Sequence, residues 1–198
     1  ARLGPDPLDP AFDVDALVLG LLRQGRGNAT EGADDVAGGQ AAPHVTAQVG
    51  SWPGHERWAE LDPLAAIAGS VRILASVPSL DTATCDAETK RFNAEAAQLS
   101  SEVYIITIST DLPVAQKRWC GVSGVDRVYA VSDHMATEFG VKYAVLMKER
   151  RWLRRAVFVV DQHDVLRYVA YMPKLGDHPD YVQVLAVARG LLSGPAAV

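Results

Sequence analysis

Short apolar runs alternate with segments of helical spacing from Val71 onward. Residues 71–77 and 103–109 are apolar enough to form strands that are buried on both faces. Between them, residues 86–99 have helical spacing, with acidic residues in the first turn. This alternation predicts a central sheet with helices packed against it, because each apolar strand face needs a covering layer.

The second half of the chain continues the alternation and adds a hairpin. Residues 113–120 are typical of a short helix that begins at a proline, and residues 126–131 of a third strand. Residues 156–161 and 165–171 flank a tight turn and predict a hairpin, and 179–192 predicts a closing helix. The order β-α-β-α-β, then β-β-α, predicts an α/β protein of thioredoxin-like fold, with a central mixed β-sheet and helices on both faces.

Composition changes near residue 43. Residues 1–43 are rich in Gly, Ala, Asp and Pro, and a Gly-rich linker follows one stretch of helical spacing. The apolar face of that stretch consists of Val14, Leu17, Val18, Leu21 and Leu22. We therefore expect an N-terminal extension over 1–43, with a short amphipathic helix, and a domain over 44–198. The helix Val14–Leu22 either folds back on the domain or docks on a protein partner.

Charge and hydropathy exclude two classes of protein. Nineteen Lys and Arg against 24 Asp and Glu give a net charge of −5, which argues against a nucleic-acid binder. No apolar run approaches the roughly 20 residues that span a membrane. The sequence begins at Ala1 without an intact signal peptide. We expect a soluble protein that is cytoplasmic or, after removal of a targeting segment, organellar.

Cysteine and histidine usage argues against a structural metal. The chain has two cysteines, Cys85 and Cys120, and five scattered histidines without metal-ligand spacing. Two cysteines are also too few for a disulfide scaffold.

Cys85 stands where the first apolar strand passes into the first long helix. A cysteine in the first helical turn lies among unpaired N–H groups at the positive end of the helix dipole, and both favour the thiolate. Because the thiolate is the nucleophile, this position makes Cys85 a candidate reactive cysteine. The alternative is a small buried apolar side chain.

Two residues upstream strengthen this candidate site. Thr82 can direct its hydroxyl toward the Cys85 sulfur or a substrate oxygen, or it can cap the helix. Pro78 can shield a thiolate and hold the loop, or it can simply end the strand. The residues alone leave these alternatives open.

The segment 78–85 resembles the P-x-x-x-T-x-x-C signature of the peroxiredoxins. Residues 91–93 and 109–121 are similar to the R-F-N and S-x-D-L-P-F-A-Q-x-R-F-C-G motifs of the thiol peroxidase branch, an atypical two-cysteine class. Further similar segments follow in order at residues 132–133, 139–141, 155–157 and 179–181. The resemblance covers residues 70–192.

The resemblance implies a role for each matching residue. Cys85 would be the peroxidatic cysteine, which attacks the peroxide and becomes a sulfenic acid. Cys120 would be the resolving cysteine, which condenses with the sulfenic acid into an intramolecular disulfide. Thr82 and Arg155 would orient the peroxide and stabilise the thiolate.

The same resemblance implies partners. They are a peroxide substrate, a thioredoxin-like dithiol that reduces the disulfide, and a second copy in a homodimer, with no cofactor. Arg155 directly precedes a predicted strand, so it can project toward Cys85, and we expect it to act through charge and orientation rather than stability. The neighbouring Arg150, Arg151 and Arg154 are typical of a solvated charged face.

Two departures from the family suggest a second hypothesis. Residues 1–43 have no counterpart in the family, and the bulky, charged residues 147–152 replace its Gly-rich loop before Arg155. The alternative function is a peroxiredoxin-like structural or interaction subunit of a larger assembly, with little or no peroxidase activity. The presence of every catalytic position favours the peroxidase.

Overall fold

The structure is a computed structural model that describes residues 35–192. The predicted helix Val14–Leu22 and most of the predicted extension lie outside the described residues. Within residues 35–192, no helix is long and apolar enough to cross a membrane.

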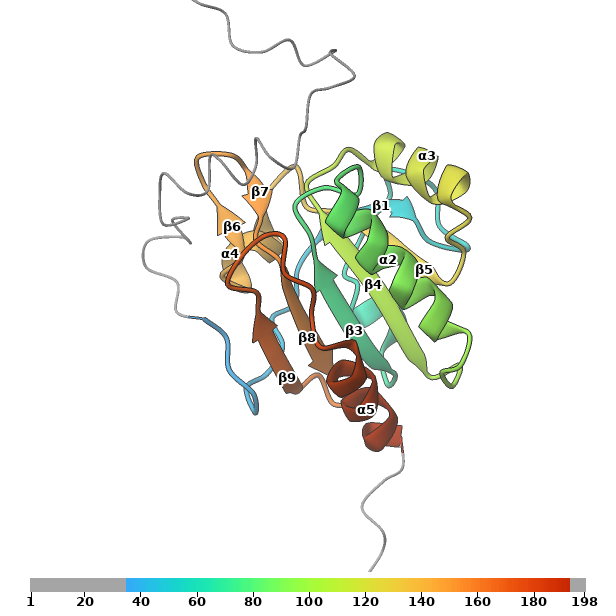
Figure 1. The fold of residues 1–198 in the computed structure, drawn as a ribbon, viewed down its shortest axis with the longest axis vertical. Helices are drawn as coiled ribbons and strands as arrows, with labels where there is room; N and C mark the ends of the chain where they lie inside the picture. Colours follow the sequence, from blue (N-terminus) through green and yellow to red (C-terminus); the bar gives the residue numbers. More distant parts are fainter. Residues whose placement is uncertain (1–34, 193–198) are drawn as a thin grey trace, which may run out of the picture.

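The middle of the sheet is parallel, and the next strand on either side runs antiparallel to it (Figure 1). The parallel strands are β3 (Val71–Ser76), β4 (Val103–Ser109) and β5 (Val128–Ser132). On one side, β8 (Ala156–Val160) pairs with β3, and β9 (Leu166–Tyr171) pairs with β8. The predicted mixed sheet and its hairpin are therefore confirmed.

Two strands on the far side of β5 complete the seven-stranded sheet. They are β1 (Ala47–Ser51) and β2 (Glu60–Leu61), and the order across the sheet is β2-β1-β5-β4-β3-β8-β9. Both strands were absent from the prediction, because β2 has two residues and β1 holds no uninterrupted apolar run.

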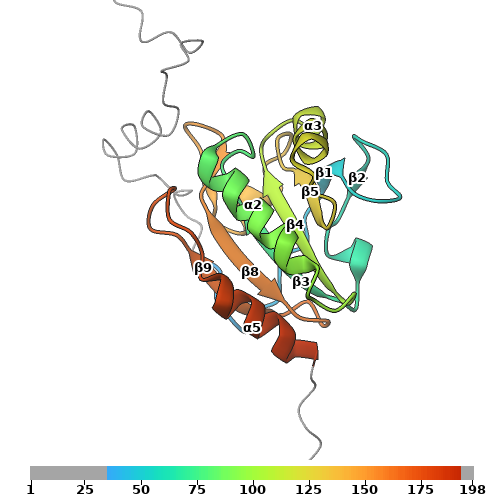
Figure 2. The ribbon, with the colours of Figure 1, turned by 45° about the vertical axis from the view of Figure 1, so that its right-hand side comes forward.

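The longer helices cover one face of the sheet (Figure 2). Helix α2 (Ala83–Ala96) packs over β4 and β5, and α3 (Pro113–Ser123) packs over β1 and β5. Helix α5 (Tyr181–Leu192) packs over β3 and β8. Helix α2 begins three residues before the predicted start. Helix α3 runs three residues past its predicted end, to Ser123, and Gly124 with φ +65° caps it.

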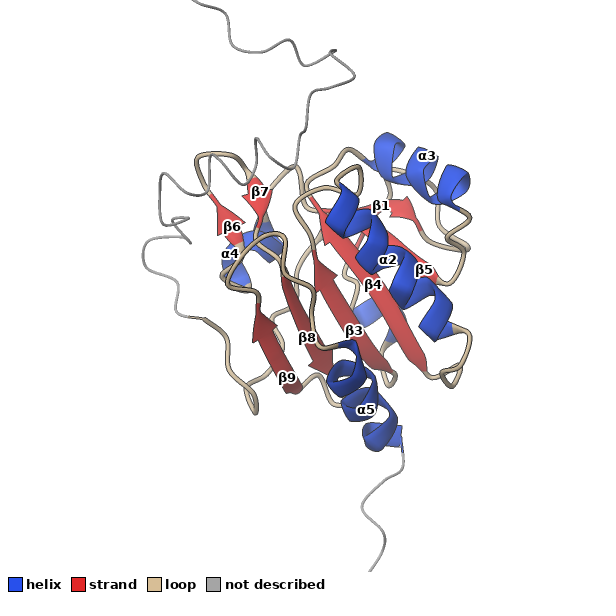
Figure 3. Ribbon diagram, in the orientation of Figure 1, coloured by secondary structure: helices blue, strands red, loops and turns tan. Residues whose placement is uncertain are grey.

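The opposite face carries shorter elements (Figure 3). They are the 3-10 helix η1 (Ala65–Ile67), helix α4 (Glu138–Lys142), and a second sheet of β6 (Leu146–Met147) and β7 (Trp152–Leu153). Phe139 of α4 and Leu146 of β6 pack in the core on this face.

Alternate strand residues supply the two cores. Ile73 of β3 and Val157 of β8 face the helices α2, α3 and α5. Leu74 and Phe158, one position further along, face the opposite side. Both faces of these strands are therefore buried, which explains why their sequences are continuously apolar.

Residues just before the predicted domain start contact the sheet. The Gly39 amide donates to the Leu166 carbonyl at 2.7 Å, and the Ala42 amide donates to the Asp164 carbonyl at 2.7 Å. The division at residue 43 stays a prediction, since residues 1–34 lie outside the described part of the chain.

Candidate active site

Cys85 lies in the first turn of α2, at the end of the loop that leaves β3. Its side chain is fully buried. Thr82 occupies the N-cap position with extended backbone angles, but its side chain makes no capping hydrogen bond. Instead, the Thr82 hydroxyl lies 2.8 Å from the Cys85 sulfur. The hydroxyl is therefore placed to donate to a thiolate. Of the two roles that the sequence allowed for Thr82, this is the contact with the sulfur and not the helix cap.

The loop between β3 and α2 is held in place by β4. The Asp111 carboxylate accepts from the Leu80 amide at 2.8 Å and from the Ser109 hydroxyl at 2.8 Å. Pro78 is buried within this loop, beyond the end of β3.

Arg155 reaches the same sulfur from the start of β8. Its Nη2 lies 3.0 Å from the Cys85 sulfur, and its Nε donates to the Leu175 carbonyl at 2.9 Å. The third contact of the guanidinium is an ion pair with the buried Glu88. The projection of Arg155 toward Cys85 matches the expectation from sequence, whereas Glu88 was missed.

The bulky segment before Arg155 supports this placement. Met147 and Trp152 pack with Leu175, whose carbonyl holds the Arg155 guanidinium. Residues of this segment thus pack against the side chain of Leu175, the residue whose carbonyl accepts from Arg155.

The Arg150–Arg155 segment is less solvated than its charge predicts. The Arg154 guanidinium stacks 3.8 Å from the centre of the Tyr171 ring and donates to the Ala144 carbonyl at 2.9 Å. It also pairs with Asp35. The assignment of Arg154 to a solvated face was therefore wrong, because the side chain joins three segments of the domain.

Burial and charge act in opposite directions on Cys85. Burial raises the pKa of the Cys85 thiol, while the Arg155 charge and the Thr82 hydrogen bond lower it, and burial outweighs them. Burial likewise raises the pKa of Glu88 to about 7, against the effect of Arg155. The helix start alone favours a thiolate, but the closed site favours neutral acid groups.

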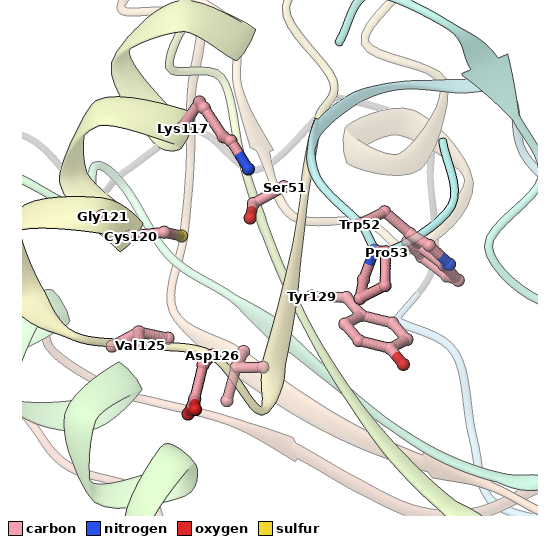
Figure 4. Close-up of a pocket in the computed structure, with 10 residues that line it drawn as sticks. Ser51, Trp52, Pro53, Lys117, Cys120, Gly121, Val125, Asp126 and Tyr129 are labelled. Carbon is pink, nitrogen blue, oxygen red and sulfur yellow. The ribbon is translucent and has the colours of Figure 1, made fainter. Parts of the chain in front are cut away.

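Cys120 lines a pocket away from the contacts of Cys85 (Figure 4). It lies in the last turn of α3, is 4% exposed, and is a free thiol like Cys85. Its sulfur points into a pocket of about 270 Å³ that Ser51, Trp52, Lys117 and Tyr129 help to line. Burial raises the pKa of Cys120, and a hydrogen bond with Ser51 and the charge of Lys117 lower it. The fold does not bring Cys120 into the contacts that join Cys85, Thr82 and Arg155.

Asp133, the residue just after β5, has a structural position. The Asp133 carboxylate accepts from the Phe139 and Gly140 amides at 3.0 and 2.8 Å, which ends the turn after β5 and begins α4. Across residues 35–192, no group of three or more His, Cys, Asp or Glu side chains is arranged to hold a metal ion.

A buried helix-start cysteine, bonded to a threonine and an arginine on a thioredoxin-like sheet, defines a redoxin-type thiol site. The redoxin family profile matches residues 39–185. A thiol peroxidase of Oceanobacillus iheyensis is 52% identical over 118 residues, which cover 60% of this chain and 71% of that protein. A thiol peroxidase of Bacillus subtilis is 45% identical over 129 residues, covering 65% and 77%.

Solved structures agree on the fold. A peroxiredoxin-like protein from Aquifex aeolicus superposes with a TM-score of 0.71 at 29% identity, covering 80% of this chain and 90% of that one. A thiol peroxidase from Chromobacterium violaceum gives a TM-score of 0.68 at 16% identity, covering 82% and 89%, and shows the fold alone. The chain belongs to the redoxin family and, within it, to the thiol peroxidase branch of the peroxiredoxins.

Proposed function

We propose that this protein is a thiol-dependent peroxidase that reduces hydrogen peroxide or organic hydroperoxides through Cys85. The observation that carries the proposal is the sulfur of Cys85, which lies 2.8 Å from a hydroxyl and 3.0 Å from a guanidinium nitrogen. Both groups are donors that stabilise a thiolate and can bind peroxide oxygens. The thiol peroxidase relatives favour the same chemistry.

In the proposed first step, the Cys85 thiolate attacks one oxygen of the peroxide. An S–O bond forms as the O–O bond breaks, and the leaving oxygen takes up a proton and departs as water or an alcohol. The sulfur is oxidised to a sulfenic acid and the peroxide is reduced. Thr82 and Arg155 hold the peroxide in line with the sulfur, and Pro78 shields the sulfur from solvent.

In the second step, the Cys120 thiol condenses with the sulfenic acid. An S–S bond forms and water leaves, so Cys85 and Cys120 are joined within one chain. Both side chains are buried, and Cys120 faces its own pocket. Disulfide formation requires Cα atoms within about 7 Å, and the two sulfurs face different surroundings, so the start of α2 and the last turn of α3 must rearrange first. A thioredoxin-like dithiol then reduces the disulfide in two exchange steps.

A second copy of the chain and a protein that binds the N-terminal segment are the proposed protein partners. Exposed apolar side chains, Trp58, Leu112 and Met135, lie on neighbouring loops. The Trp58 ring meets the His134 ring edge-on, and the Ser132 hydroxyl donates to the Asp111 carbonyl beside Leu112. We propose that this surface forms the homodimer interface.

The stripe from Val14 to Leu22 is proposed to bind a further protein. Removal of residues 1–34 tests this, because it should change partner binding without loss of the domain.

The alternative of a redox-quiet interaction subunit is tested together with the peroxidase. The purified chain is mixed with hydrogen peroxide, thioredoxin, thioredoxin reductase and NADPH, and NADPH oxidation is followed. We expect turnover by the wild type and none by Cys85→Ser. A folded wild type with both thiols free and no peroxide consumption would overturn the proposal and favour the interaction subunit. A reducing compartment is the proposed location, because the cycle needs a dithiol reductant.

A further inference from the structure

Glu88 is a buried carboxylate that the proposed reaction does not yet use. It lies one turn after Cys85 on the buried face of α2, and its side chain is fully shielded from solvent. One carboxylate oxygen pairs with Arg155, while Oε1 has no hydrogen-bond partner. Burying an ionised carboxylate with one oxygen unpaired costs free energy. The environment therefore favours the neutral Glu88 whenever a second anion pairs with Arg155.

Arg155 contacts two acidic groups with its single positive charge. Its Nη2 lies 3.0 Å from the Cys85 sulfur, and its Nη1 contacts Glu88. When Cys85 and Glu88 are both ionised, two negative charges share a single guanidinium in a buried site. Like charges this close raise each other's proton affinity, so one anion at a time is the favoured state.

Within residues 35–192, the ion pair of Glu88 is with Arg155, and the other ionisable groups near it have partners of their own. From α5, the Tyr181 ring approaches, and its hydroxyl lies 2.7 Å from Nδ1 of His178. Arg91 lies over that ring, 5.8 Å from its centre, and its own ion pair is with Glu95. Arg155, the residue just before β8, is the charged group that the described part of the chain places against Glu88.

We propose that Cys85 and Glu88 share one acidic proton across Arg155, so that the proton released by the thiol stays in the site on Glu88. This rests on the proposed role of Cys85 as the attacking thiolate. The thiolate, a hydroperoxide and the Glu88 proton then give a sulfenic acid, an alcohol or water, and the Glu88 carboxylate. The sulfenic acid is neutral, so Arg155 pairs with the Glu88 carboxylate once the peroxide is reduced. Glu88 is a positioning residue that keeps the site's charge constant.

The pH dependence of Cys85 alkylation tests the proposal. The rate with iodoacetamide is measured across pH in a Cys120→Ser background, with and without Glu88→Gln. Glutamine keeps an oxygen that accepts from Arg155 but carries no charge. We expect Glu88→Gln to lower the midpoint of the pH profile of alkylation by about one pH unit. At a pH below the midpoint, this gives about tenfold more thiolate. Glu95→Gln is the matched control, because it removes a negative charge from α2 away from Arg155, and its midpoint should not move. An unchanged midpoint in a folded Glu88→Gln protein would overturn the shared proton.

A second measurement needs no substitution at Glu88. At neutral pH, infrared difference spectra compare the free protein with protein whose Cys85 has been converted to the neutral carbamidomethyl form. We expect the band of a protonated carboxyl group to be lost on alkylation, because Glu88 becomes the only anion beside Arg155. A carboxyl band that alkylation leaves unchanged would contradict the proposal. Both readouts work without peroxide turnover, so they can fail or succeed independently of the peroxidase assay.

Discussion

The guanidinium of Arg155 lies 3.0 Å from the sulfur of Cys85, although 70 positions separate the two residues. The sheet accounts for this contact. Strands β3 and β8 are antiparallel neighbours in which Ser76 pairs with Ala156. The end of β3, where the Cys85 loop departs, therefore lies beside the start of β8. The Ser76 hydroxyl also donates to the Arg154 carbonyl at 2.9 Å and fixes the backbone next to Arg155.

Replacement of Arg155 by Met should affect both the thiol and the fold. Loss of the cation raises the Cys85 pKa further, which thiol titration measures. It also leaves Glu88 buried without its partner, and breaking a buried pair costs about 3–5 kcal/mol. Urea unfolding should report that loss, so the expectation that Arg155 leaves stability unaffected is revised.

Two further variants separate these effects. Arg155→Met combined with Glu88→Gln should regain most of the free energy of unfolding, because no charge is left unpaired. Arg151→Met, in the same basic segment but exposed, should change neither quantity. A Cys85 pKa in Arg155→Met that equals the wild-type pKa would mean that the arginine has no electrostatic effect on Cys85.

Thr82→Val should slow the reaction with peroxide, because it removes the hydroxyl that lies 2.8 Å from the sulfur. A hydrogen bond to a charged group contributes about 1.5–3 kcal/mol, so the rate constant should fall by about 10- to 100-fold. Thr82→Ser keeps the hydroxyl and should retain most of the rate. Stopped-flow measurement with Cys120→Ser as background follows the first step alone, and equal rates for the Val and Ser variants would argue against the contact.

Because of Glu88, the free energy of unfolding should fall as pH rises. Its pKa is raised from 4.5 to about 7 in the folded protein. Between these values the unfolded chain has released the proton and the folded protein retains it, so the folded state is favoured at the acidic end of the window. The slope should reach about 1.4 kcal/mol per pH unit. Urea unfolding at several pH values should show a flatter profile for Glu88→Gln than for Glu95→Gln, and parallel profiles would refute the shift.

Gly50 should be intolerant of a side chain, since α3 approaches β1 closely there. A Cβ on Gly50 would overlap Oε1 of Gln116 and lie 2.7 Å from its Cβ. Gln116 is buried and donates to the Val131 carbonyl and the Ser109 hydroxyl, both at 2.9 Å. Gly50→Ala should therefore cost about 1–3 kcal/mol of stability. Gly121→Ala, within α3 and with nothing within 4 Å, should instead stabilise by about 0.5–1 kcal/mol, and thermal unfolding compares the two.

The alternation of apolar runs was enough to predict the order of the main strands and helices, because strands buried on both faces read as continuous apolar runs. Strands of two residues, such as β2 and β6, carry no such pattern. Glu88 was missed for a different reason. A Glu in the first turns of a helix is ordinarily a surface residue, and its burial depends on Arg155, 67 positions away. One signal was available, since Cys85 and Glu88 are three residues apart and so share a helix face.

The most direct test of the proposed chemistry is mass spectrometry of the non-reduced protein after one equivalent of hydrogen peroxide. The wild type should lose two hydrogens and yield a single-chain Cys85–Cys120 disulfide. Cys120→Ser should gain one oxygen at Cys85 and oxidise further with excess peroxide, whereas Cys85→Ser should remain unmodified on the same timescale. Two free thiols in the wild type after treatment, or a disulfide that joins two chains, would contradict the roles proposed for Cys85 and Cys120.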